Sequence, residues 1–266
     1  MRRRRLDDEL IRRGLATSSE EAEEILVAGR VTVAGRSIDN PGSLVGSEEP
    51  IRVLGPPRPH ASRGGAKLAP ALARFGVDPT GRRCLDAGAA AGGFTDVLLA
   101  AGAASVVAVD VGYGQLSWRL RRDPRVTVLE RTNVLGLRPE DLPGPPDLVT
   151  ADLSFISLAT VLPSLVPLAA DGADLVLLIK PQFEARRDEV GPGGVVTDPG
   201  VWLRTLRRVE SACRKAGAGP LGVMASPVPG PAGNVEFFLH ARAGDPGRLV
   251  DLEAAVTEGA AVREAS

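Results

Sequence analysis

One stretch, residues 82–110, restricts the fold more than any other part of the chain. Within it an apolar run ends at Asp86, a turn of small residues begins at Gly88, and a second apolar run ends at Asp110 after a helix-like segment. This order of strand, glycine turn, helix and strand is typical of the unit that opens a doubly wound sheet. In such sheets the ligand crevice lies at the carboxyl ends of the strands, so we expect a binding site after these two runs.

The spacing of the glycines narrows the choice of ligand. The turn reads Gly88-x-x-x-Gly92-Gly93, which is not the G-x-G-x-x-G of dinucleotide sites, and the chain has no G-K-[ST] phosphate loop. Asp110 lies 22 residues after Gly88, where a carboxylate can accept from both hydroxyls of a ribose. These features predict S-adenosylmethionine, a ribosylated ligand without a pyrophosphate. The alternative is a glycine turn kept only for helix–strand packing.

The composition limits the classes of function. The 266 residues suffice for one sizeable core and a small appended domain. Because the net charge is −1, any binding of nucleic acid must come from local patches. Two cysteines without a C-x-x-C pair, Cys84 and Cys213, and only two histidines argue against a metal site and for a reducing compartment. No apolar run approaches about 18 residues. We therefore expect a cytoplasmic protein without a membrane partner. As a separate expectation, the protein is a monomer or weak dimer.

The pattern along the chain predicts four segments. Residues 1–55 form a small α+β domain, residues 56–66 a Pro-rich linker, residues 67–242 a sheet with helices, and residues 243–266 a polar tail. The tail contains one helical piece, Leu249–Val256. The expected fold class is α/β and Rossmann-like, with the small α+β domain at the N-terminus.

The sheet segment alternates strand-like and helix-like runs. The strand-like runs are Cys84–Ala87, Val106–Asp110, Val126–Leu129, Leu148–Asp152, Leu175–Ile179, Leu221–Ala225 and Val235–Leu239. The helix-like runs are Phe94–Ala101, Gln115–Arg121, Ser157–Leu168 and Pro199–Ala216. Such alternation predicts a mostly parallel sheet. Seven strands that end in a Gly/Pro-rich hairpin at residues 228–233 are the layout of the common class I S-adenosylmethionine-dependent methyltransferases.

The N-terminal segment predicts helices at Asp7–Gly14 and after a capping residue, Ser18, followed by strands at residues 30–36 and 51–54. Its motif resembles the small RNA-binding module first known from a small-subunit ribosomal protein, the S-four-type domain. The matching residues are Arg5, Leu6, Asp7, Leu10, Gly14, Leu15, Ser18, Ala22, Gly29, Val31, Val33, Gly35 and Pro41. The positions that depart from the family pattern are Ser19, Ala34 and Asn40.

This resemblance implies a face that binds RNA through arginines. The arginines expected to form it are Arg3, Arg4, Arg5, Arg12, Arg30 and Arg36, with Arg63 beyond the linker. Phosphate contacts from arginine would position RNA without reading its sequence. The alternative is a docking domain whose arginines are only solvated.

Four residues of the sheet segment are candidates for catalysis: Lys67, Asp152, Lys180 and Glu236. Lysine is rare in this chain, with Lys215 as its third and last occurrence. Asp152 and Lys180 end apolar runs, and strand ends open onto the crevice. Glu236 interrupts an apolar run, where an unpaired charge would be costly.

These residue types suit methyl transfer to a ribose hydroxyl. The hydroxyl must lose its proton as the new bond forms, and a lysine desolvated beside a second cation can serve as the base. Lys180 is the candidate base, and Lys67 would lower its basicity and hold the hydroxyl. Asp152 and Glu236 would orient the lysines and the methyl donor. The alternative is a structural ion pair between Lys180 and Glu236.

Seven blocks of the sequence resemble the TlyA family: Ser62–Leu68, Gly92–Asp96, Val109–Leu116, Glu130–Asn133, Asp152–Leu158, Lys180–Glu184 and Gly233–Phe237. Members of this family are ribosomal RNA 2′-O-methyltransferases with an FtsJ-like catalytic fold, and some carry the name haemolysin. The resemblance implies methylation of cytidine in 23S rRNA, and in some members also 16S rRNA, within ribosomal subunits. It implies the catalytic set named above. The Arg-rich start and the helical tail resemble the longer family members that act on both subunits.

The residues expected to contact the methyl donor are Asp86, Gly88, Gly92, Gly93, Phe94, Asp110, Asn133 and Asp152. The target nucleotide must leave its stack before its ribose can enter a crevice. The loop Val190–Val195 and the linker near Arg63 are either RNA clamps or disordered connections.

Three other functions remain open on the sequence. The chain could be an RNA-binding ribosome-associated factor with an inactive methyltransferase fold, although the four candidate catalytic residues are intact. It could be a membrane-lytic haemolysin, although no stretch is suited to span or disrupt a bilayer. A small-molecule methyltransferase is disfavoured by the N-terminal module.

Overall fold

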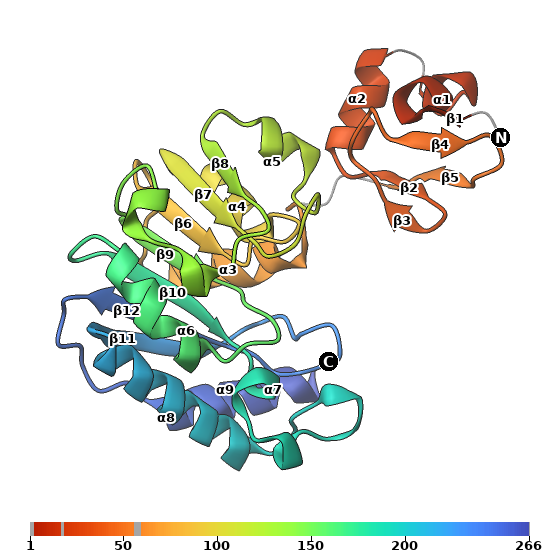
Figure 1. Ribbon diagram of the computed structural model, residues 1–266. Helices are drawn as coiled ribbons and strands as arrows, with labels where there is room; N and C mark the ends of the chain where they lie inside the picture. The colour runs from red at the N-terminus through yellow and green to blue at the C-terminus, as the bar shows by residue number, and fades with distance from the viewer. Residues whose placement is uncertain (1–2, 17–18, 56–59, 266) are drawn as a thin grey trace.

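The computed structural model describes residues 3–16, 19–55 and 60–265. It contains a small N-terminal unit and a large sheet unit (Figure 1). The predicted capping residue Ser18 and residues 56–59 of the predicted linker lie outside the described residues.

The N-terminal unit packs two helices against short strands. The helices are α1 (Leu6–Arg12) and α2 (Ser19–Val27), and the strands are β1 (Arg3–Arg5), β2 (Val31–Val33), β3 (Arg36–Ser37), β4 (Leu44–Gly46) and β5 (Ile51–Val53). Strand β2 pairs with β3 and β5, while β1 pairs with β4. Leu6 and Leu10 of α1 and Leu26 of α2 are buried in a separate core. The four-residue spacing in α1 places both leucines on one helix face.

The sheet unit is built on seven strands. They are β6 (Arg83–Ala87), β7 (Ser105–Val109), β8 (Val126–Leu129), β9 (Leu148–Ala151), β10 (Asp174–Ile179), β11 (Ala218–Ala225) and β12 (Phe237–Ala243). Their order across the sheet is β11-β12-β10-β9-β6-β7-β8. Strand β12 is antiparallel to both its neighbours, and the other pairs are parallel. This topology confirms the predicted Rossmann-like α/β fold.

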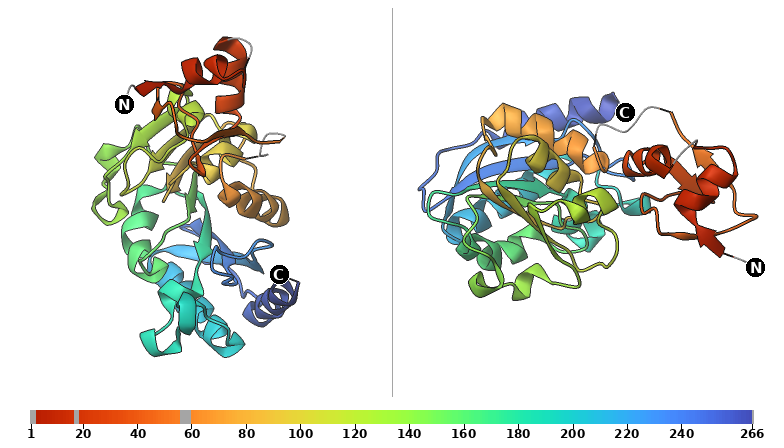
Figure 2. Two further views of the ribbon diagram at one scale, coloured as in Figure 1. Left: turned by 90° about the vertical axis from the view of Figure 1, so that its right-hand side faces the viewer. Right: turned by 90° about the horizontal axis from the view of Figure 1, so that it is seen from above.

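Helices cover both faces of this sheet (Figure 2). They are α3 (Arg63–Phe75), α4 (Gly93–Ala100), α5 (Trp118–Arg122), α6 (Leu158–Leu165), α7 (Pro181–Glu184), α8 (Pro199–Lys215) and α9 (Leu252–Glu264). Short 3₁₀ turns are η1 (Val134–Gly136), η2 (Pro139–Asp141), η3 (Val166–Leu168), η4 (Arg187–Glu189) and η5 (Pro192–Gly194).

Side-chain alternation along the strands divides the interior into two cores. In β10, Leu175 and Leu177 face the core that contains α6 and α8, whereas Val176 and Leu178 face the core that contains α3 and α4. All six residues of β10 are buried, as expected for a central strand covered on both sides.

The C-terminal helix differs from its predicted position. The sequence predicts a helix at Leu249–Val256, but α9 begins at Leu252 and continues to Glu264. The carboxylate of Asp251 caps it by accepting from the backbone N–H of Ala254 at 2.9 Å. Among the described residues, no helix has the length and apolarity needed to cross a bilayer.

Candidate active site

The carboxyl ends of the parallel strands meet at one edge of the sheet. Gly88 follows β6, Asp110 follows β7, Asp152 follows β9 and Lys180 follows β10. Strand β12 runs in the opposite direction, so Glu236, just before its first residue, lies at the same edge. The fold therefore gathers strand-end residues that are widely separated in the sequence.

Two hollows open at this edge. The larger, about 800 Å³, is lined by residues of both units and includes Lys67, Lys180 and Glu236; we call it the crevice. The smaller, about 580 Å³, extends along Gly88 and Asp110; we call it the side pocket. Residues common to both linings are Gln115, Asp152, Ser154 and Phe155. Ligands in the two hollows would therefore meet at this shared wall.

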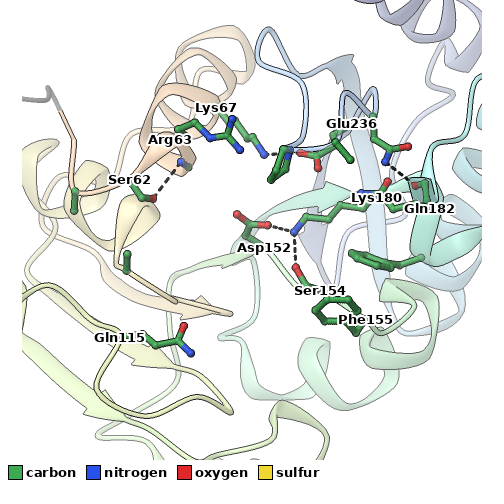
Figure 3. Close-up of a pocket in the computed structure, with 18 of the residues that line it drawn as sticks. Ser62, Arg63, Lys67, Gln115, Asp152, Ser154, Phe155, Lys180, Gln182 and Glu236 are labelled. Atoms are coloured by element: carbon green, nitrogen blue, oxygen red, sulfur yellow. Dashed lines mark hydrogen bonds and ion pairs between the residues drawn. The ribbon is translucent and has the colours of Figure 1, made fainter. Parts of the chain in front are cut away.

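The two lysines each have their own carboxylate (Figure 3). Lys180 Nζ lies 2.6 Å from Asp152 Oδ1 and donates to Ser154 Oγ at 3.0 Å. Lys67 Nζ, on α3, donates to Glu236 Oε2 at 2.7 Å. The alternative prediction, an ion pair between Lys180 and Glu236, is therefore wrong, because each of these residues pairs with a different partner.

The two pairs differ in their access to solvent. The side chains of Lys67 and Glu236 are 7% and 1% exposed, so this pair is almost completely buried. Those of Lys180 and Asp152 are 11% and 22% exposed. The Lys180 pair is thus the more accessible of the two to a ligand in the crevice.

The side pocket offers a fixed carboxylate. Asp110 accepts hydrogen bonds from the backbone N–H groups of Ala90 at 2.8 Å and Gly112 at 2.7 Å. Gly88 has φ of 85°, and a Cβ there would lie 2.4 Å from the carbonyl oxygen of Asp152. Only glycine allows this close approach. Ala90 also has a positive φ, 47°, which is strained for a residue with a Cβ.

These features fit a nucleoside. The remaining lining includes Asn133 and the apolar side chains of Val111, Val134 and Ile156, which suit a planar base. The Asn133 side chain accepts from the backbone N–H of Leu135 at 3.0 Å, so its carbonyl oxygen is held in place. S-adenosylmethionine combines such a nucleoside with an amino-acid tail and fits the donors and acceptors present.

Three predicted donor contacts, Gly92, Gly93 and Phe94, do not belong to the lining of the side pocket. A Cβ on Gly92 would lie 2.3 Å from the Leu120 side chain, and one on Gly93 would lie 2.1 Å from Ser62 Oγ. These glycines therefore allow the α3 and α5 segments to pack closely against the turn, whereas the alternative was a turn kept for helix–strand packing. Phe94 is buried in the core next to α3.

Asp86, a fourth predicted donor contact, is fully buried beneath the turn. Its carboxylate accepts from the hydroxyls of Thr95 at 2.6 Å and Thr150 at 3.2 Å. Burial raises the pKa of Asp86 to about 7, against the opposing hydrogen bond from Thr95. Asp86 thus stabilises the glycine turn through its hydrogen bonds with Thr95 and Thr150.

The raised pKa of Asp86 predicts a pH-dependent stability. In the unfolded chain the carboxyl of Asp86 titrates near pH ~4. Between about pH 4 and 7 the folded state therefore binds more protons than the unfolded state. The contribution of Asp86 to the free energy of unfolding falls as the pH rises through this range. Asp86→Asn removes the titration. When unfolding by urea is measured across this pH range, the free energy of unfolding of the variant relative to the wild type should rise by up to about 1.4 kcal/mol per pH unit. A difference that does not change with pH would contradict the assignment.

Sequence reasoning gave no role to Ser154, Phe155 or Gln182. Phe155 is 92% exposed and has φ of 63°, a conformation rare for a bulky residue. Its ring lies 5.3 Å from that of Phe183. Gln182 lines the crevice, and its side-chain amide oxygen has no hydrogen-bond partner among residues 3–16, 19–55 and 60–265. Two sequence signals could have found them: their positions just after strand ends, and the family-like blocks Asp152–Leu158 and Lys180–Glu184 that contain them.

The predicted RNA-binding arginines fall into two groups. Of these seven predicted arginines, the exposed ones without an ion pair in the described part of the chain are Arg3, Arg4, Arg36 and Arg63. The others are engaged: Arg5 pairs with Asp7, Arg12 with Glu9, and Arg30 donates to the carbonyls of Leu54 and Gly55. Arg63 lines the crevice, and Arg36 precedes Ser37, which also lines it. Arg36 and Arg63, two of the arginines without an ion pair, therefore flank the crevice.

The predicted clamp loop, Val190–Val195, is attached to the strand segment that carries Glu236. The amide of Asn234 donates to the Gly194 carbonyl at 2.9 Å and accepts from the Val196 N–H at 2.9 Å. Gly193 and Gly194 line the crevice. The role of the loop Val190–Val195 in holding RNA stays a prediction.

The described residues contain no group of three or more His, Cys, Asp or Glu side chains arranged to hold a metal ion. Cys84 and Cys213 are both buried and unbridged. Burial raises the pKa of each thiol to about 12, so neither is a reactive thiolate.

Comparison with known proteins agrees with this geometry. An FtsJ-like methyltransferase family model matches residues 60–243, and an S4 domain model matches residues 4–51. The 16S/23S rRNA (cytidine-2′-O)-methyltransferase TlyA of Mycobacterium tuberculosis is 54% identical over 242 residues, covering 91% of this chain and 90% of the relative.

Solved structures show the same likeness. A Streptococcus thermophilus protein provisionally described as a hemolysin is 35% identical and superposes with a TM-score of 0.76, covering 100% of this chain and 98% of that one. An S-adenosylmethionine-dependent methyltransferase of Mesorhizobium loti, 18% identical, shares the fold of the sheet unit with a TM-score of 0.51 over 68% of this chain and 100% of that one. The chain belongs to the TlyA family of FtsJ-like methyltransferases.

Proposed function

We propose that this chain transfers the methyl group of S-adenosylmethionine to the 2′-hydroxyl of cytidine in ribosomal RNA. The observation that carries the proposal is the wall shared by the two hollows, because Asp152 and Ser154 line both and hold Lys180 between them. The name of the Mycobacterium tuberculosis relative supports 23S and 16S rRNA as substrates. We extend both to this chain, within ribosomal subunits and hence in the cytoplasm. A monomer or weak dimer stays our prediction.

The side pocket is the proposed site of S-adenosylmethionine. Asp110 would bind the ribose hydroxyls, and the turn from Gly88 to Ala90 would lie against the nucleoside. Asn133 would approach the base edge, and Asp152 the end of the pocket nearest the crevice. When bound there, S-adenosylmethionine supplies a methyl group on a sulfonium, which is already an activated leaving group.

Lys180 is the proposed proton acceptor. Its Nζ is the only side-chain amine paired at the shared wall in the described chain. RNA that covers the crevice would exclude water from this site. The 2′-hydroxyl proton then passes to Lys180 Nζ as the new carbon–oxygen bond forms. Glu236 keeps Lys67 directed into the crevice.

RNA would enter between the two units. Arg36 and Arg63 stand on opposite units beside the crevice, and Arg3 and Arg4 are exposed on β1 of the N-terminal unit. Contacts of this kind bind phosphates and position the strand. The target base, once splayed out, would meet the exposed ring of Phe155.

Removing this ring should weaken catalysis on RNA. Stacking of a base on an aromatic side chain contributes about 1–3 kcal/mol, so Phe155→Ala should lower kcat/KM for ribosomal subunits about 10- to 100-fold. Phe155→Trp should retain most of the activity. Leu249→Ala is the matched control, because Leu249 is equally exposed, at 96%, outside the site. A Phe155→Ala enzyme within about twofold of wild type would contradict the stacking role.

The experiment that tests the function uses tritiated S-adenosylmethionine with naked rRNA, each subunit and whole ribosomes, followed by mapping of the modified sugar. We expect 2′-O-methylcytidine in rRNA from intact subunits. Donor binding without transfer to any of these substrates would favour an inactive, RNA-binding fold instead. Lysis of vesicles without the donor would support the haemolysin alternative.

A further inference from the structure

The N-terminal unit touches the sheet unit next to the glycine turn. Asp39 Oδ2 accepts a hydrogen bond from the backbone N–H of Trp118, the first residue of α5, at 2.9 Å. Asp39 and Ser37, two residues before it, also line the crevice. A domain matched as RNA-binding thus supplies part of the crevice wall and holds the start of a helix in the other unit.

That helix rests directly on the glycine turn. We call residues 115–122 the α5 segment. A Cβ on Gly92 would lie 2.8 Å from Leu116 Cδ1 and 2.3 Å from Leu120 Cδ1, so both leucines press against the turn. The Ser117 N–H donates to the Ala91 carbonyl at 3.2 Å. Any shift of the α5 segment would therefore move the turn that borders the side pocket.

Gln115, at the start of the α5 segment, lines both hollows. Two further contacts connect the same segment to its surroundings. Arg119 pairs with Asp96 of α4, whose other carboxylate oxygen accepts from the backbone N–H of Ala61 at 2.8 Å. Arg122 lies 3.5 Å from Glu23 of α2, but both side chains are more than half exposed, and such pairs contribute little. Asp39 is therefore the better-shielded contact between the α5 segment and the N-terminal unit.

We propose that Asp39 is a positioning residue for the methyl-donor site. By holding Trp118 it fixes the α5 segment against the glycine turn, so RNA held by the N-terminal unit and the donor held in the side pocket bind cooperatively. This inference rests on the proposed function for the identity of the RNA and the donor. Because such coupling is reciprocal, subunits should tighten donor binding by the same factor as the donor tightens subunit binding.

Three variants test this role. Asp39→Ala removes the acceptor, Asp39→Asn keeps an oxygen that can accept from Trp118, and Asp8→Ala removes an exposed carboxylate on α1 as a control. The readout is the dissociation constant of S-adenosylhomocysteine by calorimetry, with and without intact ribosomal subunits. Thermal unfolding of each variant verifies that it is folded.

We expect Asp39→Ala to weaken S-adenosylhomocysteine binding about 5- to 10-fold and to abolish its tightening by subunits. Asp39→Asn and Asp8→Ala should behave as the wild type. The proposal is overturned if subunits do not tighten binding to the wild type, if Asp39→Ala keeps wild-type affinity and coupling, or if Asp39→Asn is as impaired as Asp39→Ala. Binding is measured without turnover, so a failure of methyl transfer would refute the proposed function alone.

Discussion

Lys180→Ala should lower the rate of methyl transfer to ribosomal subunits by about 1,000-fold or more, because positioned general bases contribute about 10²–10⁴-fold. Lys180 lines the crevice and not the side pocket, so S-adenosylmethionine affinity should stay within about threefold of wild type. Single-turnover transfer at saturating donor gives the chemical rate, and calorimetry gives the donor affinity. Loss of the rate with retained donor binding is the signature of a missing base.

Lys215→Ala is the matched control for this substitution. Lys215 ends α8, is exposed, and is the third lysine of the chain. Its loss should leave both the transfer rate and the donor affinity unchanged. If Lys180→Ala instead keeps near-normal turnover, the proton acceptor has been misassigned.

Glu236→Leu should unfold at much lower urea concentration than the wild type and should be inactive. It leaves Lys67 buried without its partner, and breaking a buried ion pair from one side costs about 3–5 kcal/mol. That is a large part of the ~5–15 kcal/mol that stabilises a typical domain. The double variant Lys67→Met with Glu236→Leu should recover most of this stability, because apolar replacement of a buried pair is often neutral.

The double variant separates the structural from the catalytic role. If the pair directs Lys67 at the substrate, the stable double variant should still transfer methyl groups at least about 100-fold more slowly than wild type. A stable and active double variant would show that the pair serves the fold alone. Arg74→Ala provides the control for loss of an ion pair, since Arg74 and Glu258 are exposed and their pair is worth at most about 1 kcal/mol.

Much of the sheet unit is predictable because its signals are local. Apolar runs of four to six residues become strands, and a polar residue directly after such a run lies at the ligand edge of the sheet, as Asp110, Asp152 and Lys180 do. Strands β1 and β4, with sequences Arg-Arg-Arg and Leu-Val-Gly, lack the alternation of apolar and polar residues that made the equally short β2 and β5 predictable. The start of α9 was misplaced because the cap that defines it, Asp251, follows a polar stretch without periodicity.

Pairing and exposure are not local, and the sequence could not supply them. Lys67 and Glu236 are 169 positions apart, so their pairing depends on the complete sheet. The motif that contains Phe155 does not show that the ring is exposed. Gly92 and Gly93 look like ligand contacts in the sequence, but the space next to each is occupied by the side chains of Leu120 and Ser62.

The contact between the lysine and the ribose is the centre of this account. A structure of the chain bound to a ribosomal subunit and S-adenosylhomocysteine would measure it directly. We expect the 2′-oxygen of a splayed cytidine within about 3.2 Å of Lys180 Nζ. An Nζ that stays on Asp152 and Ser154, with no ribose hydroxyl within reach, would contradict the account.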